Sequence, residues 1–264
     1  MPDSSTPRLR DAVSLWAGLR ESLAHHEVIE GRNLPPLLAY LAAWQSRRLA
    51  RTHADMLHDP ACADACRFFL SDIYAPQDFS QRDYDGTRIY LFMRRFLPEQ
   101  ALTPLAMALE VNALTQQLDL ALAQAMQQHL GVSDRFDVAQ YEEAYRLCDN
   151  YATRLRQIDL IVEVGEHLAH LRRVPFIGAT LALARGPAQR LGWDHMQDFL
   201  ERGYHAWKTL KRPDAFLTTI HDREKAILNR IYGVTPAAPA TNPWLVSDGG
   251  PPELAALAAH AQED

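Results

Sequence analysis

Apolar residues recur at spacings of three and four along almost the whole chain, whereas alternating runs of β-branched residues are missing. Spacing of this kind is typical of amphipathic helices and not of strands. Side-chain oxygens before prolines mark several helix starts, as at Thr103-Pro104, and glycines such as Gly131 and Gly233 mark ends. The pattern predicts an all-α protein, with helices near residues 7–29, 35–57, 60–74, 81–97, 104–130, 137–173, 176–191, 193–211 and 213–232.

The two longest predicted helices each carry a narrow apolar seam. In residues 104–130 the seam advances in alternating steps of four and three, through Met107, Val111, Leu114, Leu118, Ala121 and Ala125. In residues 137–173 it consists of Tyr141, Tyr145, Cys148, Tyr151, Leu155, Ile158, Val162 and Gly165, and the small Gly165 is expected to admit a neighbouring backbone. Because only residues 131–136 connect the two helices, we predict a single-domain helical bundle built around this long antiparallel hairpin.

The composition changes after Gly233. Residues 234–264 are rich in Pro, Ala and Gly and lack a regular apolar pattern. A segment with so little apolar surface to bury does not offset the entropy cost of ordering its backbone. We therefore predict a helical bundle domain over residues 1–233, followed by a flexible C-terminal tail over residues 234–264.

The overall composition narrows the possible partners and compartments. Of the 264 residues, 27 are basic and 33 are acidic, which gives a net charge of −6, so no nucleic-acid partner is expected. No apolar run approaches the roughly 20 residues that span a bilayer, so no membrane contact is expected. The chain has three cysteines and a polar N-terminal stretch without a signal peptide, which indicates a cytoplasmic protein.

The segment from Phe68 to Pro98 mixes aromatic, aliphatic and charged residues more densely than any other part of the chain. Charges among so many apolar groups must pair inside the fold or face a ligand. One interpretation is a structural ion-pair network, and the other is a polar pocket that binds a ligand or a partner. The candidate site residues are Asp72, Tyr74, Arg82 and Asp83 of this segment, together with Glu110 beside the first seam.

A second candidate set lies in the 137–173 helix. Glu163 and His167 are four residues apart, as are Glu166 and His170, so each pair lies on one helix face and has the spacing to bind iron, manganese or zinc. The Glu-x-x-His spacing of di-iron helical bundles is missing from the sequence. A solvated helix face is the commoner explanation of Glu and His residues in this arrangement.

Three arginines of the same helix, Arg146, Arg154 and Arg156, alternate with acidic residues and are likewise interpreted as a solvated face. The chain also lacks Gly-x-Ser-x-Gly, a phosphate-binding loop and Gly-x-Gly-x-x-Gly, which are typical of hydrolases, NTPases and dinucleotide-binding enzymes. We therefore expect a binding or scaffold protein without a cofactor, which engages a protein partner, a second copy of itself or a small ligand. The alternative is a metal-dependent enzyme that uses the carboxylate and histidine set.

Five stretches of the sequence carry a resemblance to a known family: FFLSDIYAPQDFSQRD at residues 68–83, and then RRFLPEQAL, ALEVNAL, FLERGYHAWKTL and FLTTIHDRE. Together they resemble an uncharacterised, all-helical family of bacterial proteins, and the likeness covers most of residues 35–232. The resemblance implies a wholly helical cytosolic protein. It implies no activity and no catalytic residue.

Overall fold

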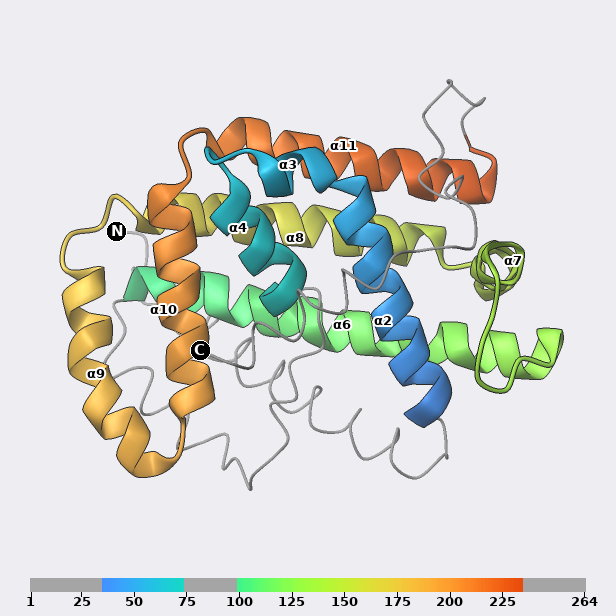
Figure 1. Ribbon diagram of the computed structural model, residues 1–264, viewed down its shortest axis with the longest axis horizontal. Helices are drawn as coiled ribbons and strands as arrows, with labels where there is room; N and C mark the ends of the chain where they lie inside the picture. The colour runs from blue at the N-terminus through green and yellow to red at the C-terminus, as the bar shows by residue number, and fades with distance from the viewer. Residues whose placement is uncertain (1–34, 74–98, 235–264) are drawn as a thin grey trace, which may run out of the picture.

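The computed structural model describes residues 35–73 and 99–234 (Figure 1). The first range contains α2 (Pro35–Thr52), α3 (Ala54–His58), α4 (Ala63–Phe68) and the π-helical turn η1 (Phe69–Ile73). The second contains α6 (Glu99–Leu130), α7 (Val138–Cys148), α8 (Tyr151–Leu171), α9 (Ile177–Leu191), α10 (Asp194–Thr209) and α11 (Pro213–Tyr232). Every element in these two ranges is helical, which confirms the predicted all-α fold.

Three long helices form the body of the bundle. Helix α8 packs against both α6 and α11 and runs antiparallel to each of them (Figure 1). Helix α2 packs across α6, and α9 and α10 form an antiparallel pair at one end of the bundle. The predicted hairpin is therefore present, with α6 as its first arm and α8 as the main part of its second arm.

The second arm is not one continuous helix, as the sequence analysis expected. It breaks between α7 and α8, where Asp149 adopts a left-handed backbone conformation with φ 46°. Aspartate and asparagine tolerate this region better than most residues, so Asp149-Asn150 can end one helix and begin another. The hydroxyl of Tyr232 accepts a hydrogen bond from the Asn150 N–H and donates to the Tyr145 carbonyl at 2.7 Å. A residue of α11 thus satisfies backbone groups that the break exposes.

The first arm begins earlier than the sequence predicted. Helix α6 starts at Glu99, and Pro104 lies inside it and not at its first position. A proline inside a helix removes the hydrogen bond that its own N–H would have made, and its ring crowds the carbonyl four residues earlier, which bends a helix without always ending it. Helix α6 continues through Pro104 to Leu130.

Two hydrophobic clusters fill the interior. One cluster lies among α4, α8, α10 and the start of α11 and includes Phe69, Leu160, Val164, Trp207 and Leu217. The other lies among α2, the end of α6, α7 and the end of α11 and includes Leu41, Leu122, Tyr141, Ile158 and Leu228. Helices α2, α6 and α11 contribute residues to both clusters. Along each helix, polar residues lie between the part in one cluster and the part in the other: Gln45, Arg48, Thr115, Asp119 and Glu224. The polar residues therefore lie where the two clusters meet.

Gly165 of α8 is a point of close packing, although not against a backbone. A Cβ atom placed there would lie 2.3 Å from Leu217 Cδ2 and 3.0 Å from the Trp207 ring. Two large side chains from α11 and α10 therefore occupy the space that the missing side chain leaves.

The predicted helices at 7–29 and 81–97, and the predicted tail after Val234, lie outside the described residues. Helix α11 ends at Gly233, which has a left-handed φ of 67°, as expected from the sequence. Among the described helices, none combines the length and the apolar character that crossing a membrane would require.

Candidate functional site

The first predicted site is only partly within the structure. Tyr74, Arg82 and Asp83 lie outside the described residues, and Asp72 lies in the π-helical turn η1. Glu110 is exposed on α6, and its charge is close enough to Arg156 of α8 to help raise the pKa of that guanidinium. The grouping of these residues into one site stays a prediction.

The second predicted set lies on the outer face of α8. Glu163 accepts a hydrogen bond of 2.6 Å from Arg156, and this bond is the main reason that the pKa of Arg156 is raised. Glu166, His167 and His170 are exposed. Across residues 35–73 and 99–234, no three His, Cys, Asp or Glu side chains are grouped so that they could hold a metal ion. The described geometry therefore matches a solvated face.

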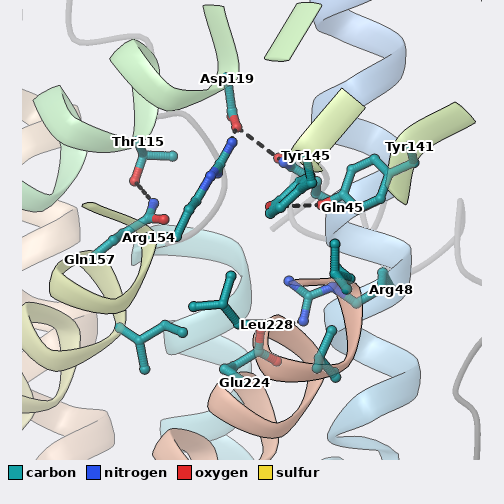
Figure 2. Close-up of a pocket in the computed structure, with 13 residues that line it drawn as sticks. Gln45, Arg48, Thr115, Asp119, Tyr141, Tyr145, Arg154, Gln157, Glu224 and Leu228 are labelled. Carbon is teal, nitrogen blue, oxygen red and sulfur yellow. Dashed lines mark hydrogen bonds and ion pairs between the residues drawn. The ribbon is translucent and has the colours of Figure 1, made fainter. Parts of the chain in front are cut away.

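The structure shows a different site in the middle of the bundle. A cavity of about 40 Å³ lies between α2, α6, α7, α8 and α11 (Figure 2). A cavity of this size has room for roughly three water molecules. Its polar lining consists of Gln45, Arg48, Thr115, Asp119, Tyr141, Tyr145, Arg154, Gln157 and Glu224.

Arg154 of α8 is the central cation of this cavity, with only 4% of the residue exposed. Its Nη2 donates to the carbonyl of Leu118 at 3.0 Å, and its guanidinium lies 4.3 Å from the centre of the Tyr145 ring. A cation over an aromatic face is stabilised by the ring quadrupole. Its Nε is buried and has no hydrogen-bond partner among the described residues. Within residues 35–73 and 99–234, this N–H is therefore an unsatisfied donor.

Asp119 of α6 is the acid nearest to Arg154. Its Oδ1 lies 3.9 Å from Arg154 Nη1, too far for a hydrogen bond, and accepts one from Gln45 Nε2 at 3.0 Å. Burial raises the pKa of Asp119, and neither the charge of Arg154 nor the bond from Gln45 fully offsets that effect. The carboxylate is therefore incompletely compensated inside the fold.

Two phenols form another part of the wall. The hydroxyl of Tyr141 donates to that of Tyr145 at 2.9 Å, four residues further along α7. Burial, together with the neighbouring Tyr145, raises the pKa of Tyr141 well above its usual value. Tyr141 therefore stays protonated and neutral and can serve as a hydrogen-bonding group but not as a base.

A second ion pair lies on the other side of the cavity. Arg48 of α2 donates to Glu224 of α11, whose other oxygen lies 3.2 Å from Nε2 of the fully buried His53. Burial alone would raise the pKa of Glu224, but the charge of Arg48 and the hydrogen bonds from His53 and Arg48 lower it to about 2. Figure 2 shows Arg48 and Glu224 grouped away from Asp119 and Arg154. Both oxygens of Glu224 therefore have a direct partner, and the pair connects α2 to α11.

The prediction that Arg154 lies on a solvated face is wrong, because the side chain is almost fully buried. A signal for burial was present. Arg154 lies three residues after Tyr151 and four before Ile158, so it shares the face of the α8 seam. Glu224 likewise lies four residues from both Ile220 and Leu228 of the core. A charged residue in register with an apolar seam was therefore the sequence signal for burial.

The comparison with known proteins identifies a family but no activity. A family model described as Domain of unknown function (DUF8198) matches residues 24–238. No curated protein and no solved structure matches the chain.

Proposed function

We propose that this chain, which belongs to the DUF8198 family, is a binding protein whose central cavity holds a small neutral ligand of the amide type. The proposal is carried by the gap between the partly buried Asp119 and the buried Arg154, opposite charges with 3.9 Å between their nearest atoms. A direct hydrogen bond between such groups would be about 2.7–2.9 Å long. The gap leaves both side chains able to bind a further polar group.

An amide provides an acceptor for Arg154 and a donor for Asp119. Its carbonyl oxygen can accept from Arg154 Nε, which has no partner among the described residues. Its N–H can donate to the carboxylate of Asp119, whose only hydrogen bond in the described structure comes from Gln45. A ligand that forms hydrogen bonds with both groups removes the free-energy cost of leaving a donor and an acceptor without partners inside the fold.

The charge balance of the cavity favours a neutral ligand over an ion. Its lining contains two arginines and two carboxylates, Arg48 with Glu224 and Arg154 with Asp119, and therefore no net charge from these four groups. An ionic ligand would bring an additional charge into a buried site without a new partner to neutralise it, which is costly. A neutral ligand avoids that cost.

The size of the cavity limits both the ligand and its affinity. About 40 Å³ suits a ligand as small as acetamide, which has four non-hydrogen atoms. Small ligands gain at most about 1.5 kcal/mol per non-hydrogen atom, so four atoms give at most about 6 kcal/mol. The corresponding Kd is no tighter than about 40 µM, and we expect millimolar binding of acetamide.

The test is a titration of the full chain with three small molecules of different charge: neutral acetamide, anionic acetate and cationic methylammonium. The side-chain Nε–H signal of Arg154, assigned by its loss in Arg154→Lys, reports on the cavity in proton–nitrogen NMR spectra. We expect acetamide to shift this signal with saturation, while acetate and methylammonium leave it in place. An unmoved signal at saturating acetamide, or an equal response to acetate, would contradict the proposal.

A pair of matched variants separates binding in the cavity from binding elsewhere. Asp119→Asn replaces the acceptor that the proposal assigns to the ligand, and we expect it to abolish saturable acetamide binding. Asp64→Asn makes the same change on α4, where Asp64 is exposed and paired with Arg67 at 2.9 Å, and should bind acetamide as the parent chain does. Equal losses in both variants would show that acetamide does not bind beside Asp119.

A protein-contact function is the second candidate, and the outer face of α9 favours it. Phe176, the residue before α9, and Leu183 of α9 are 80% and 74% exposed. Phe176 also has a left-handed backbone with φ 67°, which is uncommon for a bulky residue. Exposed apolar groups of this kind are typical of contact surfaces.

The partner we propose for this surface is a second copy of the chain. Light scattering of the full chain over a range of concentrations should show a dimer that Phe176→Ser with Leu183→Ser converts to monomer. Leu147→Ser, a change at an exposed leucine of α7, serves as the control and should leave the mass unchanged. A parent chain that is monomeric at every concentration would exclude this candidate.

A further inference from the structure

A second cavity lies between α4, α6, α8, α9 and α10. It measures about 80 Å³, twice the volume of the polar cavity, and shares no lining residue with it. Its walls are almost entirely apolar and include Phe68, Val164, Leu168, Leu181, Phe199 and Trp207. Because these residues come from four helices of the bundle, the cavity is built into the fold.

Glycine at position 203 shapes one wall of this cavity. A Cβ atom at Gly203 of α10 would lie 2.7 Å from the end of the Phe68 ring. Phe68 of α4 can therefore lie flat against α10, with its ring centre 5.4 Å from that of Phe199. The aromatic rings line the cavity and leave it open, because no side chain projects from position 203.

Three residues with polar groups, Arg172, Tyr204 and Trp207, interrupt the apolar lining. Arg172, which follows α8, is the one charged residue among the described residues that line the cavity, and its Nη1 donates to the carbonyl of Leu210 at 2.8 Å. Trp207 is 3% exposed, and its indole N–H has no hydrogen-bond partner among the described residues. A fixed cation and an unsatisfied donor both favour an acceptor that carries negative charge.

We propose that this cavity binds a small carboxylate with an apolar body, whose hydrocarbon part fills the cavity and whose carboxylate pairs with Arg172. The apolar walls exclude a wholly polar anion, because burying it there would strip its hydration without replacement. The charge of Arg172 disfavours a cationic amphiphile of the same shape. Pockets of this composition, apolar with a few placed polar groups, are typical of small-molecule sites. The proposal is independent of the amide site and uses none of its residues.

The test is calorimetric titration of the full chain with hexanoate, hexan-1-ol and hexylammonium, which share a six-carbon chain and differ in the head group. We expect hexanoate to bind, hexan-1-ol to bind more weakly and hexylammonium not to bind. Equal affinities of hexanoate and hexan-1-ol would overturn the assignment of a carboxylate. If none of the three ligands binds, the proposed site is overturned.

Two adjacent arginines provide the matched variants. Arg172→Gln should weaken hexanoate binding by at least about tenfold, the usual effect of losing a charged hydrogen-bonding partner. Arg173→Gln changes the exposed neighbour, which does not line the cavity, and should leave the affinity unchanged. Ala108→Phe gives a second test, since it fills the cavity from α6 and should abolish binding of hexanoate and hexan-1-ol alike. Unchanged hexanoate affinity in either Arg172→Gln or Ala108→Phe would overturn the proposal.

Discussion

The two carboxylates that line the central cavity, Glu224 and Asp119, differ in their partners and in the direction of their pKa shifts. Glu224 is paired directly with Arg48 and with His53, and its pKa is lowered to about 2. Asp119 lies 3.9 Å from Arg154, and its pKa is raised. Burial disfavours both ionised forms, so the difference comes from the partners. One half of the cavity thus stabilises the fold, while the other retains groups that a ligand can satisfy.

The two ion pairs also join different pairs of helices, with different structural consequences. Arg48 and Glu224 join α2 to α11, which are separated by most of the sequence, and so fix how the outer helices pack. Arg154 and Asp119 join α6 to α8, which already pack along their lengths. A loose ion pair is tolerated there because apolar packing of the hairpin holds the helices together without it.

The largest expected effect on the free energy of unfolding comes from replacing Glu224, the carboxylate with direct partners. Glu224→Gln removes the carboxylate that pairs with Arg48 and His53 inside the bundle, and removal of one partner of a buried pair costs about 3–5 kcal/mol. We expect a loss of this size in the free energy of unfolding, measured by urea denaturation at pH 7. Glu143→Gln is the control, because Glu143 forms an exposed pair with Arg146 that is worth at most about 1 kcal/mol. Equal effects of the two substitutions would remove the distinction between the two halves of the cavity.

Acid pH should weaken the same interaction in the parent chain. The pKa of Glu224 falls from 4.5 to about 2 on folding, so its contribution is complete above pH 4.5 and is lost as the pH falls toward 2. Between pH 6 and pH 3 the stability difference between the parent chain and Glu224→Gln should therefore shrink by about 2 kcal/mol. Urea denaturation of both proteins at the two pH values measures this change. A difference that stays constant would show that Glu224 is not stabilised in its ionised form.

The sequence predicted the helices better than the site, and particular residues explain why. The apolar seams of α6 and α8 depend on local spacing, so periodicity was sufficient to find the hairpin. The break at Asp149 depends on Tyr232, a residue 82 positions from Asn150 that only the folded chain brings near. Nothing in the local sequence distinguishes a polar pair that ends a helix from one on a solvated surface.

The same limit applies to the cavity. Arg48 and Glu224 are 176 residues apart in the sequence, and nothing in either helix identifies the other residue as its partner. Their pairing follows from the way α2 and α11 pack, which periodicity does not determine. Burial of a charge could be predicted from its register with a seam, as for Arg154, but the identity of its partner could not.

The smallest expected effect on stability is that of Asp119→Asn, and it separates a structural role from a binding role. The raised pKa means that the folded chain holds the proton more tightly than the unfolded chain, so ionised Asp119 does not stabilise the fold. Asparagine keeps an oxygen for Gln45 and removes the poorly compensated charge, although it also leaves Arg154 without a nearby anion. These two effects oppose each other, and we expect the free energy of unfolding to change by less than about 1 kcal/mol. Urea denaturation at pH 7 measures this change, and acetamide titration of the same variant should show that saturable binding is lost. A loss of stability as large as that in Glu224→Gln would mean that both carboxylates are structural and that the cavity is an ordinary part of the core.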